Sequence, residues 1–139
     1  MTKKKVLFLC TGNSCRSQIG EGLLRHMGGD KFEVFSAGVE PSRVHPMSIL
    51  VMNELDIDIS QQSSDDVNDY LSAGIDIVIS VCDHAAKTCP TFPGDVERIH
   101  WSIKDPFHGW DVDEPFLPQY RDTREDLKQR IQNFLNNDN

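Results

Sequence analysis

Hydrophobic residues along the chain form short β-like runs that are separated by segments of helical character. The runs cover residues 6–9, 32–35, 75–81 and, more weakly, 96–101, and such runs predict strands. Residues 75–81 are almost continuously apolar, which is typical of a strand covered on both faces of a parallel sheet. The alternation predicts a small α/β domain in which residues 75–81 form a central strand.

Apolar residues at helical spacing form stripes between and after these runs. The stripes are Ile19, Leu23, Leu24 and Met27; Ile49, Met52 and Leu55; and Leu127, Ile131, Phe134 and Leu135. We interpret all of them as the core-facing sides of helices, rather than as binding grooves. Gly28-Gly29-Asp30 predicts the end of the first helix, and Pro118 predicts the beginning of the last.

Length and charge narrow the classes of function. With 139 residues, the chain is predicted to be a single domain over residues 1–139, because domains commonly contain about 100–150 residues. The net charge of −8 argues against nucleic-acid backbones and anionic membranes as partners. No apolar run approaches the length of a membrane span, and Lys3–Lys5 lead directly into the first strand without a signal-peptide pattern. We therefore expect a soluble, monomeric, cytoplasmic protein.

The segment from Cys10 to Ser17 reads Cys-Thr-Gly-Asn-Ser-Cys-Arg-Ser and lies between the first predicted strand and the first predicted helix. Small residues in such a turn let successive backbone N–H groups point into one concavity, and the helix N-terminus adds positive potential. The planar guanidinium of Arg16 can pair with two oxygens of one anion. The segment predicts a site for a tetrahedral oxyanion, formed by Thr11, Gly12, Asn13, Ser14, Cys15 and Arg16.

Cys10 is the predicted nucleophile of this site. The N–H dipoles, Arg16 and a hydrogen bond from the Ser17 hydroxyl would all favour the thiolate, so we expect a lowered pKa for Cys10. The alternative is a strand-end cysteine with an unrelated surface arginine. For Cys15, packing inside the loop is favoured over a second nucleophile, because no separate feature requires it to be reactive.

Asp105, followed by Pro106, is the candidate general acid. Breaking an oxygen away from a tetrahedral oxyanion is easier when a carboxylic acid protonates it. Asp105 opens an irregular stretch between Trp101 and Pro118, and a parallel sheet would deliver it to the same edge as Cys10. An ordinary Asp-Pro turn is the alternative interpretation.

Taken together, these segments resemble the low-molecular-weight tyrosine phosphatase fold and, more closely, the thioredoxin-coupled arsenate reductases built on it. The resemblance rests on residues 10–18, 36–38, 56–60, 82–90, 100–101 and 105–106. It implies a four-stranded parallel sheet flanked by helices. It also implies that Cys10 is the attacking thiolate, that Arg16 and the loop amides bind arsenate, and that Asp105 protonates the departing oxygen.

The resemblance further implies a monovalent cation, such as potassium, beside the anion loop. The positions that match this site are Asn13, Glu21, Ser36 and Asp65. Oxygen-rich ligands suit such an ion, while ordinary solvation of polar side chains is the alternative, and residues 61–64 depart from the usual flank. No tightly bound cofactor is otherwise expected.

Cys82 and Cys89 are the predicted redox thiols, because arsenate reduction needs two electrons and two thiols that become one disulfide supply them. Cys82 ends the predicted central strand and would emerge at the same edge as Cys10. We expect Cys82 to attack the sulfur of Cys10, and Cys89 then to attack Cys82 by thiol–disulfide exchange. The segment from Cys82 to Cys89 is expected to loosen on oxidation, and the resemblance makes thioredoxin the external reductant.

Two other functions are compatible with the sequence. A phosphatase acting on phosphotyrosine or small phosphoesters needs only one cysteine and water. Residues 107–110 read Phe-His-Gly-Trp where phosphotyrosine enzymes of this fold usually present tyrosines, which favours a small inorganic substrate. Cys82, His84 and Cys89 are also suitable types for a zinc or arsenite sensor, although structural zinc sites usually have tighter cysteine pairs and a fourth ligand. The remaining His26, His45, His100 and His108 are interpreted as surface or packing residues.

Overall fold

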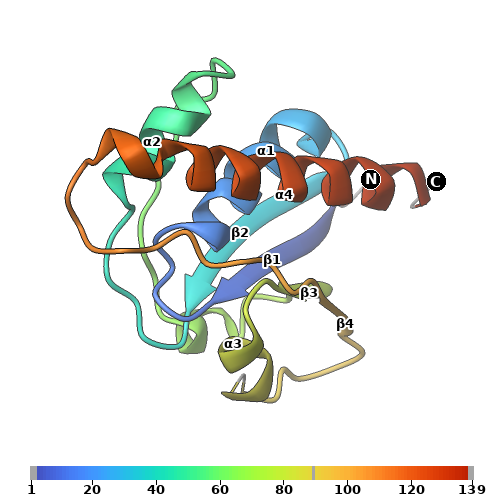
Figure 1. Cartoon of the computed structure of the whole chain (residues 1–139). Coiled ribbons are helices and arrows are strands. Elements are labelled where there is room, and N and C mark those ends of the chain that lie inside the picture. The colour runs from blue at the N-terminus through green and yellow to red at the C-terminus, as the bar shows by residue number, and fades with distance from the viewer. Residues whose placement is uncertain (1–2, 89, 138–139) are drawn as a thin grey trace.

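The computed structural model describes residues 3–88 and 90–137, in which parallel strands alternate with helices (Figure 1). The strands are β1 (Lys4–Cys10), β2 (Phe32–Gly38), β3 (Ile77–Ser80) and β4 (Glu97–His100). The α-helices are α1 (Arg16–Gly28), α2 (Pro46–Asn53), α3 (Asp83–Thr88) and α4 (Leu117–Asn137), and two short 3-10 helices are η1 (Val67–Tyr70) and η2 (Glu114–Phe116). Each β-like run of the sequence therefore contains a strand, as predicted.

The four strands form one parallel sheet in the order β2-β1-β3-β4. In its register, Leu9 of β1 lies opposite Ala37 of β2 and Ser80 of β3. Because all strands run in the same direction, their carboxyl ends meet at one edge of the sheet. The strand within residues 75–81 lies between β1 and β4, so its predicted central position is confirmed.

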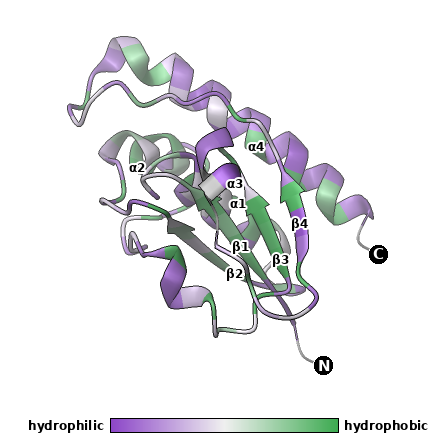
Figure 2. Ribbon diagram, turned by 90° about the horizontal axis from the view of Figure 1, so that it is seen from below, coloured by the Kyte–Doolittle hydropathy of each residue, from purple (hydrophilic) through white to green (hydrophobic). Residues whose placement is uncertain are grey.

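The core lies between this sheet and the helices that cover it. The strands β1 and β3 contribute fully buried side chains such as Leu7, Leu9 and Ile79, and Figure 2 shows both strands as hydrophobic. Helix α1 packs on β1 and β2 and contacts α4, while α3 contacts β1 and β3. Leu23 of α1 and Leu127 of α4 are buried, which confirms the predicted core-facing stripes.

Some boundaries differ from those that the sequence predicts. Helix α2 ends at Asn53, so Leu55 lies beyond it, and the chain then turns through Asp56, whose φ of 60° is left-handed. The stretch before Pro118 is irregular as expected, except for η2. Helices α3 and η1 were not predicted as elements of their own, because four to six residues are too short to show an apolar period.

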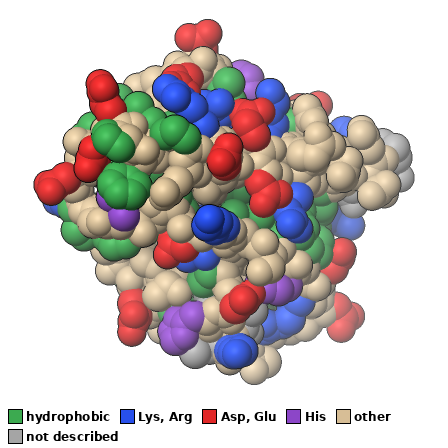
Figure 3. Space-filling view, viewed as in Figure 1, with side chains coloured by type: hydrophobic (Ala, Val, Ile, Leu, Met, Phe, Trp, Pro, Cys, Tyr) green, Lys and Arg blue, Asp and Glu red, His purple; other side chains and the backbone are tan. Residues whose placement is uncertain are grey.

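Charged side chains of both signs occur together on the face of the molecule that Figure 3 shows, where acidic and basic side chains lie interspersed. Among residues 3–88 and 90–137, no helix is long and apolar enough to cross a membrane.

Candidate active site at the carboxyl edge of the sheet

The loop between β1 and α1 forms the floor of a cavity of about 200 Å³ at the carboxyl edge of the sheet. Three segments that are distant in sequence meet here: the loop itself, the chain after β2, and the stretch after β4. The cavity is lined by Cys10, Thr11, Gly12, Ser14, Cys15, Arg16, Ser42, Asp105, Phe107 and Trp110. The structure therefore brings together most of the predicted anion-binding residues, the predicted nucleophile and the predicted acid.

The backbone of the loop is held from its outer side by the chain that follows β2. Val39, Glu40 and Ser42 donate N–H bonds to the carbonyl oxygens of residues 10, 11 and 12, at 3.2, 2.8 and 3.0 Å. Gly38 allows this close approach, because a Cβ atom at that position would lie 2.5 Å from the Thr11 carbonyl oxygen. These bonds engage the carbonyl oxygens of residues 10–12, and the loop N–H groups take no part in them.

The sulfur of Cys10 receives hydrogen bonds from within the loop. The backbone N–H of Asn13 donates to it at 3.2 Å, and the Ser17 hydroxyl oxygen lies 2.8 Å away. The Asn13 side-chain amide donates to the same Ser17 oxygen at 2.7 Å. The Ser17 hydroxyl can therefore accept from Asn13 and donate its own proton to a Cys10 thiolate. The predicted contact between Ser17 and Cys10 is present, and it is oriented to stabilise a thiolate.

The expected lowering of the Cys10 pKa is wrong for this structure. Cys10 is only 3% exposed, and burial raises the pKa of its thiol above the ordinary value. The Ser17 hydrogen bonds and the charge of Arg16 lower the pKa, but they do not outweigh the loss of hydration. The sequence shows which charges and donors surround this cysteine, whereas its depth depends on how the strands and helices pack.

Arg16 and Asp105 face each other across the cavity. Arg16 Nη2 lies 3.4 Å from Asp105 Oδ2, and Nη1 donates to the Ile103 carbonyl oxygen at 3.1 Å. The other oxygen of Asp105 accepts a bond from the Phe107 N–H at 3.0 Å. The acid is half exposed and the guanidinium largely buried. An anion that binds here would therefore meet Arg16 already oriented and would compete with Asp105 for its positive charge.

Cys82 lies directly after β3 and is buried beside the anion loop. Its sulfur is 3.2 Å from the Thr11 hydroxyl oxygen, so the thiols of Cys10 and Cys82 flank the same residue of the loop. Helix α3 begins at the next residue, Asp83. Cys89 lies outside the described residues. The placement of Cys82 at the edge that holds Cys10 agrees with the prediction from the strand pattern.

Cys15 is buried at the start of α1. Its sulfur contacts the hydroxyl oxygens of Tyr120 and Ser14, each at 3.7 Å. Burial raises the pKa of this thiol. These contacts support the interpretation of Cys15 as a packing residue of the loop.

The four residues of the predicted cation site lie in one hydrogen-bonded chain. The Asn13 amide donates to Ser36 Oγ at 3.0 Å, Ser36 Oγ donates to Glu21, and the Asp65 N–H donates to Asn13 Oδ1 at 2.9 Å. Glu21 is also paired with Arg25, a residue that the sequence analysis did not include. Burial raises the pKa of Glu21. The site therefore holds carboxylate, hydroxyl and amide oxygens, together with one guanidinium.

The zinc or arsenite sensor would use Cys82, His84 and Cys89, and Cys89 lies outside the described residues, so this alternative stays untested. No group of three or more His, Cys, Asp and Glu side chains placed to hold a metal ion occurs among residues 3–88 and 90–137.

Comparison with models of known protein families identifies the family of this chain. The model for low molecular weight phosphotyrosine protein phosphatases matches residues 5–138. The chain belongs to this family. Membership confirms the fold expected from the resemblance, and the loop that holds Cys10 and Arg16 lies within the matched residues.

Several proteins that are similar to this chain are named arsenate reductases. One from Halalkalibacterium halodurans is 42% identical over 134 residues, which are 96% of each chain. A solved arsenate reductase in its phosphate-binding state is 36% identical, with a TM-score of 0.78 over 96% of this chain and 98% of the other. A thioredoxin-dependent arsenate reductase of Corynebacterium glutamicum is 28% identical, with a TM-score of 0.66 over 94% of this chain and 62% of that one.

Sequence reasoning missed Ser42, whereas it placed residues 107–110 near the entrance of this family member's site. Ser42 lines the cavity and donates its hydroxyl to the Gly12 carbonyl oxygen at 2.9 Å, but nothing in the local pattern marks it. Phe107 and Trp110 form part of the cavity wall, with their rings 5.3 Å apart and nearly perpendicular. Their position after Asp105-Pro106 was a signal for such a wall.

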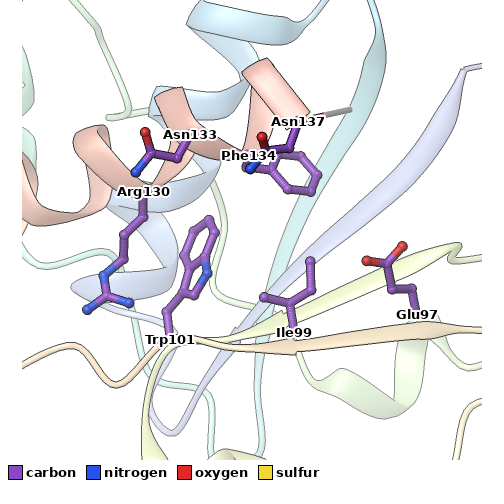
Figure 4. Close-up of a pocket in the computed structure, with 7 residues that line it drawn as sticks. All are labelled: Glu97, Ile99, Trp101, Arg130, Asn133, Phe134 and Asn137. Atoms are coloured by element: carbon purple, nitrogen blue, oxygen red, sulfur yellow. The ribbon is translucent and has the colours of Figure 1, made fainter. Parts of the chain in front are cut away.

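A larger cavity of about 440 Å³ lies elsewhere, between β4 and α4 (Figure 4). Trp101, Ile99 and Phe134 form its apolar part, and polar side chains such as Arg130 and Asn133 lie at its rim. None of the residues predicted for catalysis or anion binding lines it.

Proposed function

We propose that this chain reduces arsenate to arsenite through a relay of Cys10, Cys82 and Cys89, and that thioredoxin regenerates it. The observation that carries the proposal is the pair of buried thiols at the anion loop, one at its start and one 3.2 Å from the Thr11 hydroxyl. A phosphatase needs the first thiol, but it has no use for the second. The names of the similar family members support the choice of arsenate.

The first step joins arsenic to sulfur. Arg16 and the N–H groups of residues 11–16 bind the arsenate oxygens, and Ser17 stabilises the Cys10 thiolate that attacks arsenic. A sulfur–arsenic bond forms while one arsenate oxygen leaves as water, with Asp105 supplying a proton. Because burial raises the pKa of Cys10, the thiol must lose its proton on the way to this adduct. An oxygen of the arsenate dianion in the cavity is a base that can accept this proton.

The second step transfers the electrons. Cys82 attacks the sulfur of Cys10, the sulfur–arsenic bond breaks, and its electron pair stays on arsenic, which leaves as arsenite. Two thiols have then supplied two electrons and are joined as a disulfide. Attack by Cys89 on Cys82 frees Cys10 and leaves a Cys82–Cys89 disulfide, which a dithiol such as thioredoxin reduces by exchange. The reaction takes place in the cytoplasm in this proposal, where the thiols stay reduced between turnovers.

Mapping the cysteine linkages tests the relay. Reduced protein is mixed with an equal amount of arsenate, quenched with an alkylating agent and analysed by mass spectrometry. We expect a Cys82–Cys89 disulfide in the wild-type chain, a trapped Cys10–Cys82 disulfide in Cys89→Ser, and no disulfide in Cys10→Ser. Phosphate is the matched control, because it fits the same cradle and cannot accept the electrons. Arsenite formation with every thiol still unbridged would overturn the proposal.

Hydrolysis of phosphate monoesters is the second candidate activity. It is favoured by the residues that line the cavity, because Cys10, Arg16 and Asp105 supply a nucleophile, an anion ligand and an acid without any need for a second thiol. Such hydrolysis would use Cys10, Arg16 and Asp105, and it would persist in Cys82→Ser. Arsenate turnover with thioredoxin would be lost in the same variant, which separates the two activities.

We also propose that a monovalent cation such as potassium binds at Asn13, Glu21, Ser36 and Asp65. The types of donor fit such an ion, because carboxylate, hydroxyl and amide groups lie in one hydrogen-bonded chain there and Glu21 is buried. Its positive charge would stabilise the ionised form of Glu21, in addition to the charge of Arg25. These residues also hold Asn13 in place, and Asn13 contacts both Cys10 and Ser17.

A further inference from the structure

We infer that His45 is a positioning residue, which holds the loop carrying Asp105 against the loop carrying Cys10. The sequence analysis interpreted this histidine as a surface or packing residue. In the structure it is fully buried immediately before α2, and its backbone and ring contact different parts of the site. The inference concerns the same site as the proposed function and deepens it.

The side chain of His45 is locked in one tautomer. Its Nδ1 accepts the backbone N–H of Met47 at 3.1 Å, which caps the first turn of α2. A ring nitrogen that accepts a hydrogen bond carries no proton, so in the neutral ring the proton is on Nε2. Nε2 therefore donates to the Gly109 carbonyl oxygen, at 2.7 Å. One imidazole thus joins the start of α2 to the stretch that follows Asp105.

The backbone of His45 joins the same position to the anion loop. Its N–H donates to the Ser14 carbonyl oxygen at 3.0 Å, and the Ser48 hydroxyl donates to that oxygen at 3.2 Å. Ser14 lines the cavity beside Cys10. His45 is therefore bonded through its backbone to the loop that binds the anion, and through its ring to the loop that brings the acid.

Aromatic contacts add to these bonds. The imidazole stacks on Trp110, with ring centres 5.1 Å apart and planes at 15°, and it meets the edge of Phe107 at 5.6 Å and 89°. The Phe107 N–H in turn holds one carboxylate oxygen of Asp105 at 3.0 Å. A continuous path of contacts therefore runs from His45 through Phe107 to Asp105.

The acid depends on such an anchor because its own surroundings are sparse. The Asp105 side chain is 50% exposed, and residues 101–113 form neither helix nor strand. Gly109, whose carbonyl accepts the His45 bond, has a φ of 123°, a conformation that other residues rarely adopt. A loop without its own secondary structure is positioned by the side chains that it contacts, and His45 provides both a hydrogen bond and ring contacts.

Single-turnover kinetics tests this role. His45→Phe keeps an aromatic ring and removes both side-chain hydrogen bonds. His45→Gln retains an amide donor that can reach the Gly109 carbonyl.

We expect His45→Phe to slow formation of the first disulfide from arsenate by about tenfold or more, since a general acid contributes roughly 10²–10⁴-fold. The dissociation constant for phosphate depends mainly on the anion loop and Arg16, with Asp105 as a competitor, and it is expected to change less than the rate, by less than about threefold. His45→Gln should recover part of the rate, and His26→Phe, at an exposed histidine of α1, is the matched control.

Coupling to Asp105 separates positioning from general damage. If His45 acts through Asp105, adding His45→Phe to Asp105→Asn should reduce the rate of disulfide formation little further. If the two residues act independently, the rate reductions of the two single variants should multiply. Hydrogen exchange gives a readout that needs no turnover. Amides of residues 105–112 should exchange faster in His45→Phe than in the wild type, while those of β1 and β3 stay protected.

The outcomes distinguish this inference from the proposed function. Unchanged exchange at residues 105–112, or effects of the two variants that multiply, would overturn the role of His45, even if arsenate is reduced. If the wild-type chain fails to reduce arsenate, the proposed function is wrong. Faster exchange confined to residues 105–112 in His45→Phe would still establish His45 as the anchor of that loop.

Discussion

At the scale of single residues, the site is governed by the balance between burial and hydrogen bonding at Cys10. Burial raises the pKa of the thiol, while Ser17 and Arg16 lower it. Asn13 contributes indirectly. Its side-chain amide donates a hydrogen bond to Ser17 Oγ, and the Ser17 hydroxyl is then placed to donate its proton to the sulfur of Cys10. The reactivity of Cys10 is therefore set by a few polar contacts that work against a buried environment.

Replacing Ser17 should expose this balance. Ser17→Ala removes the hydroxyl that lowers the pKa of Cys10, so the pKa is expected to rise further and the thiolate fraction at neutral pH to fall. Alkylation of Cys10 by iodoacetamide at pH 7 should slow by about three- to tenfold, because one pKa unit is a tenfold change in thiolate. Ser72→Ala, at an exposed serine, is the matched control. An unchanged alkylation rate would mean that Ser17 does not stabilise the thiolate.

At the scale of elements, the anion loop is held by the end of β2. The carbonyl oxygens of residues 10–12 bind N–H groups of residues 39–42, and this is possible because β1 and β2 are neighbours in the sheet. Gly38 is the point of closest approach. The sequence motif supplies the loop, but the chain that follows the neighbouring strand β2 binds its carbonyl oxygens.

Adding a methyl group at this contact should disturb the loop without touching the nucleophile. A Cβ atom at Gly38 would lie 2.5 Å from the Thr11 carbonyl oxygen and 3.0 Å from the Asn13 nitrogen, and backbone atoms cannot move aside easily. Gly38→Ala is expected to destabilise the fold by about 1–3 kcal/mol and to weaken phosphate binding by at least about tenfold. Urea unfolding and phosphate titration measure the two effects. Phosphate affinity that matches the wild type would show that the loop adapts.

At the scale of the whole molecule, the last helix is tied to the rest by an ionic contact as well as by its apolar face. Glu54, just after α2, contacts Arg121 and Arg124 of α4, each at 2.7 Å. These arginines lower the pKa of Glu54 to about 2. Arg124 also donates to the Val51 carbonyl oxygen at 2.8 Å, so the contact closes the end of α2 against α4.

This contact should make stability depend on pH in the acid range. Because the folded pKa of Glu54 lies below its ordinary value of 4.5, its contribution is present above about pH 4.5 and is lost as the pH falls through about 2. At pH 7, Glu54→Gln is expected to lower the free energy of unfolding by on the order of 1 kcal/mol, since the group is partly exposed and screened. The difference should vanish near pH 2. Asp126→Asn breaks an exposed pair with Arg130 within α4 and should cost less than about 0.5 kcal/mol. An equal loss in both variants would contradict the special role of Glu54.

Local pattern was sufficient to predict which residues form the strands and where the reactive groups emerge. Continuous apolar residues specify a strand buried on both faces, and a parallel sheet delivers its carboxyl ends to one edge. The strand pattern therefore predicts that Cys10, Cys82 and Asp105 lie at that edge. The spacing of residues 10–17 also predicted a loop that leads into a helix, because the small residues and the arginine are adjacent in the chain.

Tertiary structure alone decided the depth of Cys10, the support from Gly38, the pairing of Glu21 with Arg25 and the anchoring by His45. Each depends on atoms from segments far apart in sequence, and none leaves a periodic signal. Hydration is lost only when remote side chains pack around a group, so a sequence that names every charge near Cys10 still leaves the direction of its pKa shift open. Periodicity reports the side of an element that faces the core, whereas packing determines which polar groups meet there.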